Sequence, residues 1–239
     1  KSLYAPSRFL AEFTSERFGR SVDVLHTPIF FPTDIDTFEQ PDHIPKPYVL
    51  FFGKMTVKKG ILVLARAMRE FLKTRPDWHF VAIGQNSEAP DGRSMLHHVK
   101  TILQDYLDRV LCIDALPHDR LLPIIKDSEF VAIPSLADNL PNALIESLYF
   151  KKRVVATTGS CFEDHLADPP AGILVKPNDA LELTDALFTM AEMDELTIAK
   201  MERAAEIQSN RLSPEAIVPN LEKAFHAHIM RTRNLEETK

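Results

Sequence analysis

Cysteine is scarce in this chain of 239 residues, where Cys112 and Cys161 lie far apart and no Cys-x-x-Cys motif occurs. A disulfide framework or a zinc knuckle therefore finds no support, and a reducing setting such as the cytoplasm fits better. Basic residues are outnumbered, with 28 Lys and Arg against 34 Asp and Glu, which gives a net charge of -6. Because nucleic-acid-binding proteins need a basic face for the phosphates, this balance argues against a nucleic-acid partner.

Long apolar runs are also lacking. No stretch reaches the roughly 18 residues that a membrane-spanning helix needs, and no signal-peptide pattern opens the chain. The sequence begins at Lys1 rather than Met, so we expect a piece of a longer protein, whose targeting signals need not lie here. We expect a cytoplasmic location and leave open peripheral contact with the inner membrane face.

Motifs that bind metals or carry a nucleophile do not stand out in the sequence either. No His-x-x-x-His, Asp-x-Asp or Ser-His-Asp arrangement rises above chance, and we expect neither a metal ion nor another cofactor. We interpret the histidines as ordinary surface or structural residues, among them His97, His98, His118 and His165.

Apolar runs without in–out alternation recur from residue 48 onward, which is typical of strands buried on both faces of a sheet. They cover residues 48–52, 78–83, 109–113, 130–133, 154–156 and 172–175. Amphipathic helical stretches separate them, including residues 61–72, 94–107 and 121–125. The pattern predicts an α/β fold: a Rossmann-like parallel sheet with helices on both faces, and a helical C-terminal tail with caps at Asn178 and Ser213.

Three parts of the chain are expected from composition. Residues 1–45 combine a strand, a helix, a second strand and a proline-rich linker, which is stiff because each proline ring fixes its own φ. Residues 46–212 form the main domain, and residues 213–239 form a C-terminal helix.

The stretch Ile133-Pro-Ser-Leu-Ala-Asp-Asn-Leu-Pro-Asn-Ala-Leu-Ile-Glu146 organises the main domain. It predicts a buried strand, a loop and a helix that begins near Pro141, with Asn139 as its cap. Asp138 lies in the loop and Glu146 about two turns into the helix. Both carboxylates therefore belong to the edge of the sheet where ligands bind in open α/β folds, and the helix N-terminus there suits an anion.

A second loop joins the first strand of the main domain to its helix and reads Gly53-Lys54-Met-Thr-Val-Lys-Lys59-Gly60. Glycine at a strand end lets a ligand approach the backbone, and lysine at a helix start can hold a phosphate as a point charge. Taken alone, the loop is more typical of a solvated lysine cluster. Its position at the same sheet edge as Asp138 and Glu146 favours a site.

These two loops together resemble the donor site of retaining glycosyltransferases of the GT-B type, in the large family usually called family 4. The resemblance implies that Gly53, Lys54 and Lys59 hold the donor's diphosphate, that Glu146 accepts hydrogen bonds from the ribose, and that Asp138 lies near the sugar. Backbone N–H groups of Asn139, Leu140 or Asn142 would approach the sugar and phosphate. Asp138, Glu146 and Lys59 would be the catalytic residues.

The resemblance implies a function for the parent protein: transfer of a hexose from a nucleotide sugar to an acceptor, with retention of configuration, as in polysaccharide biosynthesis. The acceptor, a glycan, a lipid or a small molecule, would bind mostly to an N-terminal domain of which residues 1–45 are the tail and linker. Membrane contact would also pass through that domain. We therefore expect the chain alone to be inactive.

The sequence departs from the family at several points. Asp138 stands where the family usually has Glu, residues 33–38 keep only part of the family's linker motif, and the turn before Val154 is changed. Two alternatives stay open: another nucleotide-sugar enzyme on the same fold, such as an epimerase or a sugar-phosphate synthase, and a non-catalytic α/β binding module.

Overall fold

A parallel six-stranded sheet forms the centre of the chain in the computed structural model, which describes residues 3–32, 38 and 44–237. Its strands are β3 (Tyr48–Phe52), β4 (His79–Ile83), β5 (Val110–Ile113), β6 (Phe130–Ile133), β7 (Arg153–Thr157) and β8 (Gly172–Val175). Their order across the sheet is β5-β4-β3-β6-β7-β8, and every neighbouring pair is parallel. The order reverses between β3 and β6, which is the topological switch point of a Rossmann-like sheet.

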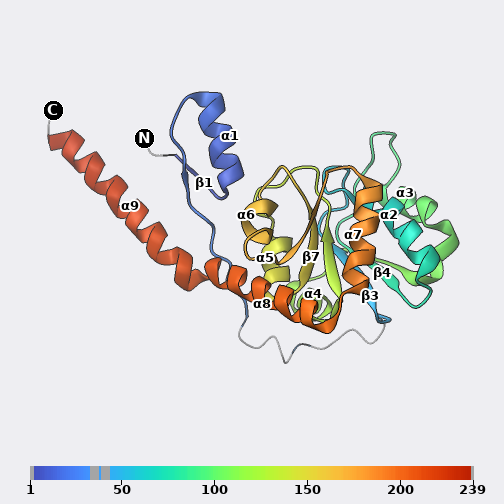
Figure 1. The fold of residues 1–239 in the computed structure, drawn as a ribbon. Coiled ribbons are helices and arrows are strands. Elements are labelled where there is room, and N and C mark those ends of the chain that lie inside the picture. The colour runs from blue at the N-terminus through green and yellow to red at the C-terminus, as the bar shows by residue number, and fades with distance from the viewer. Residues whose placement is uncertain (1–2, 33–37, 39–43, 238–239) are drawn as a thin grey trace.

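Helices cover both faces of this sheet (Figure 1). They are α2 (Ile61–Thr74), α3 (Met95–Ile102), α4 (His118–Asp127), α5 (Asn142–Tyr149), α6 (Phe162–Leu166), α7 (Ala180–Glu192) and α8 (Glu195–Arg211). Alternate residues of β3 point to opposite faces, so Val49 and Phe51 pack with α2, α3 and α7, whereas Leu50 packs with α4, α5 and α8. The predicted sheet with two helical layers is therefore confirmed.

The N-terminal unit contains β1 (Tyr4–Ala5), α1 (Arg8–Phe18) and β2 (Asp23–Val24), and its two strands pair in parallel. The Ser7 hydroxyl caps α1 by accepting a hydrogen bond from the Leu10 backbone N–H at 3.2 Å. Gly19 ends the helix in the left-handed conformation, with φ of 61°. This unit lies beside α6, and the predicted strand–helix–strand is confirmed (Figure 1).

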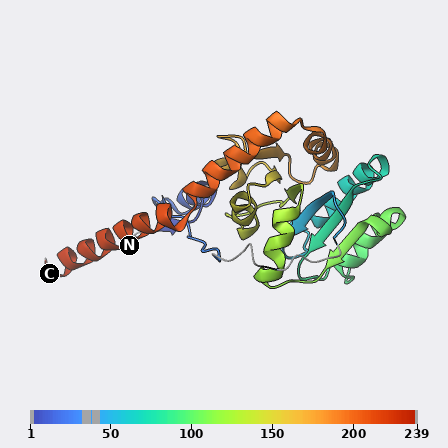
Figure 2. The same cartoon turned by 90° about the horizontal axis from the view of Figure 1, so that it is seen from below.

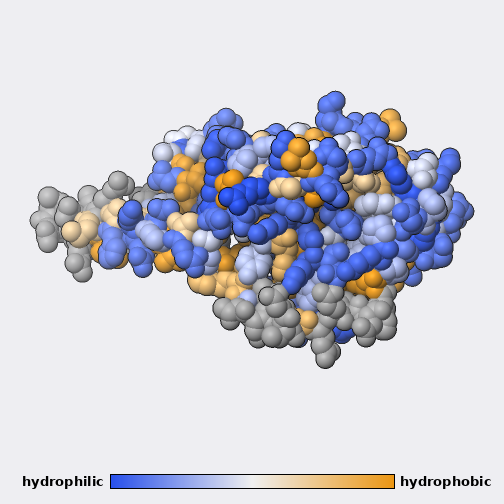
Figure 3. All heavy atoms as spheres, turned by 60° about the horizontal axis from the view of Figure 1, so that its bottom comes forward, coloured by the Kyte–Doolittle hydropathy of each residue, from blue (hydrophilic) through white to orange (hydrophobic). Residues whose placement is uncertain are grey.

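A long helix, α9 (Pro214–Glu237), follows α8 and extends away from the sheet (Figures 1 and 2). The predicted cap is confirmed, because the Ser213 hydroxyl accepts from the Ala216 N–H at 3.3 Å. Figure 3 shows a mostly hydrophilic face with separate hydrophobic patches. No helix in the described part of the chain is both long and apolar enough to cross a membrane.

Three local predictions need correction or fall outside the described residues. The helix expected over residues 94–107 ends at Ile102, and a 3-10 segment, η2 (Gln104–Arg109), follows with Tyr106 at a non-helical φ of -133°. The cap of α7 is Asp179, whose carboxylate accepts from two backbone N–H groups, whereas Asn178 has φ of 60° and precedes the helix. The linker motif at residues 33–38 lies outside the described residues except for Phe38.

Candidate functional site

The carboxyl ends of β3 and β6 meet at the switch point, and the loops that leave them contact each other directly. The backbone N–H of Leu136 donates to the carbonyl of Lys58 at 2.8 Å, which joins the β6–α5 loop to the β3–α2 loop. Gly60 caps α2 with φ of 75°, and a Cβ there would lie 1.9 Å from the carbonyl oxygen of Pro134. Only glycine permits this approach, so the sequence fixes the loop contact.

The loops after β3 and β4 are in similarly close contact. Gly84 has φ of 148°, and a Cβ on it would lie 1.9 Å from the carbonyl oxygen of Gly53. The Gly53 N–H donates to the carbonyl of Ile83, and the Met55 N–H donates to that of Gln85, both at 2.9 Å. The floor of the candidate site is therefore built from backbone, and Lys54 directly follows Gly53 at this floor.

A pocket of about 300 Å3 opens above this floor. Its walls come from the ends of three strands and from the first turns of α4 and α5, and they carry the side chains of Lys54, Gln85, Leu116, His118, Asn142 and Glu146. Glu146 is only 4 % exposed. Helix α5 places this carboxylate at the inner wall because the neighbouring helix residues Leu144, Ile145 and Leu148 are buried in the core.

Electrostatics at Glu146 are unusual for a glutamate. Burial raises its pKa above the ordinary value, and the nearby His118 opposes this rise. The His118 Nε2 lies 3.3 Å from the Glu146 Oε1, and the imidazole side chain is 64 % exposed at the pocket mouth. A buried carboxylate beside one polar partner keeps spare acceptor capacity, which suits a ligand that presents hydroxyl groups.

Lys59 and Asp138 form the second part of the site. The Lys59 Nζ lies 2.6 Å from the Asp138 Oδ2, and their side chains are 29 % and 12 % exposed. The Ser135 hydroxyl donates to the same carboxylate oxygen at 2.9 Å, and the Asn139 backbone N–H donates to Oδ1 at 3.0 Å. The ammonium group therefore ties the end of the β3–α2 loop to the β6–α5 loop.

The start of α5 differs from the prediction. Pro141 is the capping residue rather than the first helical residue, and it makes no side-chain capping bond. Asn139 is not the cap, since its Oδ1 accepts a hydrogen bond from the Ser7 hydroxyl of the N-terminal unit. Leu140 adopts φ of 52°, a left-handed conformation that is costly for a residue with a side chain and that clusters at functional sites.

The structure thus groups the predicted site residues in two sets. Gly53, Lys54, Asn142 and Glu146 line the pocket, whereas the other four, Lys59, Asp138, Asn139 and Leu140, belong to the neighbouring loops. His118 was interpreted as an ordinary histidine, and its place beside Glu146 was missed. Its position shortly after the strand at residues 110–113 is the signal that could have found it, since that strand end meets the same sheet edge.

No set of three or more His, Cys, Asp or Glu side chains is arranged to hold a metal ion in the described ranges. His97 and His98 are adjacent on α3 with ring centroids 5.7 Å apart, and the His98 Nε2 lies 3.0 Å from a carboxylate oxygen of Asp91.

Comparisons with known proteins agree on one family. Residues 46–193 match the family described as "Glycosyl transferases group 1". Alpha-D-kanosaminyltransferase from Streptomyces kanamyceticus is 25 % identical over 171 residues, which cover 72 % of this chain and 43 % of that enzyme. The chain spans roughly two fifths of the length of the curated relatives that it matches first, with 43 %, 38 % and 36 % covered.

Solved structures share the fold at low sequence identity. A glycosyltransferase from Rickettsia africae has a TM-score of 0.77 at 18 % identity, with 94 % of this chain and 62 % of that chain covered. The Anabaena protein HepE, solved in complex with UDP-glucose, has a TM-score of 0.75 at 20 % identity, with 95 % and 64 % covered. The sheet, its two helical layers and the adjoining N-terminal unit are therefore a known arrangement.

Proposed function

The chain belongs to the family of group 1 glycosyl transferases, and on that basis we propose that it is the donor-binding domain of a GT-B enzyme. The enzyme transfers a sugar from a nucleotide sugar to an acceptor and releases the nucleoside diphosphate. The observation that carries this proposal is the buried Glu146 carboxylate in a pocket next to Lys54, at the switch point of a parallel sheet. A fold relative has been solved with UDP-glucose, which supports a nucleotide sugar as the ligand here.

In this proposal Glu146 binds the ribose of the nucleoside diphosphate, and Lys54 and Lys59 bind its two phosphates. The Glu146 carboxylate is acceptor-only when ionised and accepts hydrogen bonds from the two ribose hydroxyls. Lys54, on the glycine-lined floor of the pocket, and Lys59, just before the start of α2, contact the diphosphate. Cations held in a shielded site stabilise the charge that develops on the leaving diphosphate as the glycosidic bond breaks.

Asp138 orients the sugar in the proposed complex. Without a ligand, its carboxylate is paired with Lys59. At a separation of 2.6 Å the carboxylate already neutralises the lysine, so an arriving diphosphate competes with Asp138 for the ammonium group. The Asp138 oxygen atoms released by this exchange can then accept hydrogen bonds from sugar hydroxyls. We assign backbone N–H groups of Asn139, Leu140 or Asn142 to contacts with the sugar and phosphate.

Division into parts follows the same proposal. Residues 1–45 are the end of an acceptor-binding domain and its linker, residues 46–212 bind the donor, and residues 213–239 form a C-terminal helix. The acceptor, together with any contact with the cytoplasmic membrane face, belongs mostly to residues beyond this chain, since the chain spans about two fifths of its relatives. We further propose that transfer retains the anomeric configuration and needs no metal.

Thermal unfolding with a panel of nucleoside diphosphates tests donor binding. A ligand at about 100 times its dissociation constant stabilises the native state by about 2.7 kcal/mol, so the melting temperature should rise clearly. If none of the panel moves the melting temperature at millimolar concentration, the donor site is wrongly assigned.

Product analysis with the full-length enzyme separates the remaining alternatives. A transferase releases nucleoside diphosphate only when an acceptor is present, whereas an epimerase converts the nucleotide sugar without releasing it. A sugar phosphate that serves as the acceptor would identify a synthase. We expect the 239-residue chain alone to transfer no sugar, and acceptor-dependent turnover by this chain would contradict the proposed division into domains.

A further inference from the structure

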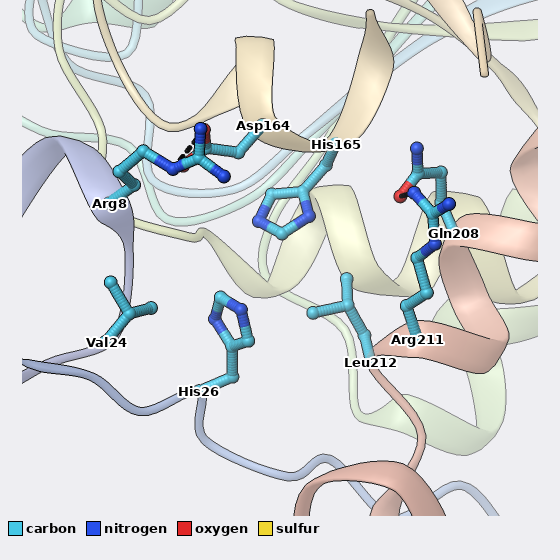
Figure 4. A pocket seen from close by; sticks show the side chains of 8 residues that line it. All are labelled: Arg8, Val24, His26, Asp164, His165, Gln208, Arg211 and Leu212. Atoms are coloured by element: carbon cyan, nitrogen blue, oxygen red, sulfur yellow. Dashed lines mark hydrogen bonds and ion pairs between the residues drawn. The ribbon is translucent and has the colours of Figure 1, made fainter. Parts of the chain in front are cut away.

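A second pocket lies away from the candidate donor site, where the N-terminal unit meets α6 and α8. Its volume is about 190 Å3. Figure 4 shows that Arg8, Val24 and His26 come from the N-terminal unit, whereas Asp164, His165, Gln208, Arg211 and Leu212 come from the main domain. An occupant of this pocket therefore contacts both parts of the chain.

The pocket is positively charged in a chain whose net charge is -6. Two guanidinium groups line it and only one carboxylate, Asp164, whose Oδ1 lies 3.6 Å from the Arg8 Nε. Arg211 makes hydrogen bonds to neutral acceptors instead, donating to the Asp168 carbonyl at 3.1 Å and to the Gln208 Oε1 at 3.4 Å. Within the part of the chain that the structure describes, no carboxylate forms an ion pair with Arg211, so the pocket keeps excess positive charge.

His165 adds a buried polar group that has no partner. His165 is only 5 % exposed, and its Nε2 is buried without any hydrogen bond among the described residues. Burial, reinforced by the nearby His26, lowers the pKa of His165 to about 4, so the ring is neutral at pH 7 and carries one N–H donor. An unsatisfied buried polar atom beside a cavity calls for a ligand, an ion or a water molecule that completes its hydrogen bonding.

His26 packs edge-on against His165 in the wall of the pocket, with ring centroids 5.5 Å apart (Figure 4). Its Nδ1 lies 2.8 Å from the carbonyl oxygen of Pro6, which fixes the ring and leaves Nε2 for another partner. The donors of Arg8, His26, His165 and Arg211 thus come from several segments. Helix α1 and the chain just after β2 supply Arg8 and His26, whereas α6 and α8 supply His165 and Arg211.

We propose that this pocket binds a phosphate group and that the bound phosphate joins the N-terminal unit to the main domain. The cavity holds about six water molecules at about 30 Å3 each, which is room for a phosphate and a few further atoms. Guanidinium groups bind phosphate through paired, charge-assisted hydrogen bonds. A tetrahedral phosphate accepts from donors on several sides, whereas a planar carboxylate offers two oxygen atoms in one plane. The proposal does not depend on the donor site.

Inorganic phosphate and glycerol 3-phosphate are the probes for this site, and the 239-residue chain is the protein to titrate. Calorimetry measures the affinity, and the imidazole C–H signals of His26 and His165 in NMR spectra report whether the phosphate enters this pocket. We expect saturable binding of one phosphate per chain, with both histidine signals shifted. Tighter binding of glycerol 3-phosphate would identify a phosphate monoester as the ligand, and tighter binding of inorganic phosphate would identify the free ion.

Arg8→Gln and Arg211→Gln should each weaken phosphate binding at least about tenfold, since each removes charge-assisted hydrogen bonds. Arg8→Gln is the safer variant for folding, because the Arg8 side chain is 70 % exposed. Arg203→Gln is the matched control on α8, with a side chain 77 % exposed that pairs with Glu206 outside the pocket. No binding at millimolar phosphate, unshifted histidine signals, or an equal loss in the Arg203 control would each overturn the proposal.

Discussion

Glu146→Gln is the substitution that tests the donor site most directly, because it keeps the shape of the side chain and removes its charge. In the proposed complex the Glu146 carboxylate accepts one hydrogen bond from each ribose hydroxyl. The amide retains a single acceptor oxygen and presents a donor where the second acceptor was. A hydrogen bond to a charged group contributes about 1.5–3 kcal/mol, so the variant should bind nucleoside diphosphate about 10- to 150-fold more weakly.

Calorimetric titration with a nucleoside diphosphate and its 2′,3′-dideoxy counterpart assigns this loss to the ribose. The wild-type chain should prefer the ribose form strongly, whereas Glu146→Gln should discriminate little, and the difference is the coupling energy between carboxylate and hydroxyls. Glu202→Gln on the exposed face of α8 is the matched control and should keep the wild-type preference. A Glu146→Gln variant that still prefers the ribose form as strongly as wild type would refute the assigned role.

The same substitution should stabilise the ligand-free chain at neutral pH. Burial raises the pKa of Glu146 in the folded state above its unfolded value. A group shifted in this direction contributes stability at pH values below its unfolded pKa, and this contribution is lost as pH rises through the folded pKa. Glutamine does not ionise, so the variant should match wild type near pH 4 and melt at a higher temperature at pH 8. A variant that melts below wild type at pH 8 would show that the buried charge is well compensated.

Four further substitutions test neighbouring groups. Lys59→Ala should weaken nucleoside diphosphate binding by at least about tenfold while hardly changing nucleoside binding, and equal losses in calorimetry would indicate misfolding instead. Asp138→Asn frees the lysine, so affinity for the diphosphate should rise a few fold while affinity for the sugar conjugate falls, and a loss of both would disprove this exchange. His118→Ala should move the titration of Glu146, followed by carboxyl-carbon NMR, to higher pH, because the histidine opposes the rise of that pKa. Gly60→Ala places a methyl group 1.9 Å from a backbone carbonyl at a positive φ, and urea unfolding should detect a loss of more than about 1 kcal/mol.

The fold could be predicted from the sequence because its signals are local and repeated. The apolar run at residues 48–52 forms a strand that is buried along its whole length. The periodic apolar residues between Ile61 and Leu72 form the buried face of one helix. Such a pattern depends only on the order of apolar and polar residues within one segment, so it can be recognised without knowing what the segment contacts. The helix over residues 94–107 was predicted too long because its apolar spacing continues past the point where Tyr106 leaves helical geometry.

The site was predicted less completely because its contacts join distant segments. The Lys59–Asp138 ion pair spans 79 positions, and nothing in either loop alone distinguishes it from two solvated charges. Asn139 has the right chemistry for a cap, yet its side chain contacts Ser7 instead, at a separation of 132 positions. His118 resembled any exposed histidine until the sheet order brought its helix beside Glu146.

The backbone contacts at Gly60 and Gly84 have a consequence for the kinetics of ligand binding. Peptide groups hold the three loops of the donor site against one another, so their positions do not depend on how side chains rotate. A ligand that enters finds the floor already formed and does not have to order a mobile segment, which removes one entropic cost of association. Association should then be limited mainly by diffusion and orientation, and differences in affinity between related donors should arise in their dissociation rates.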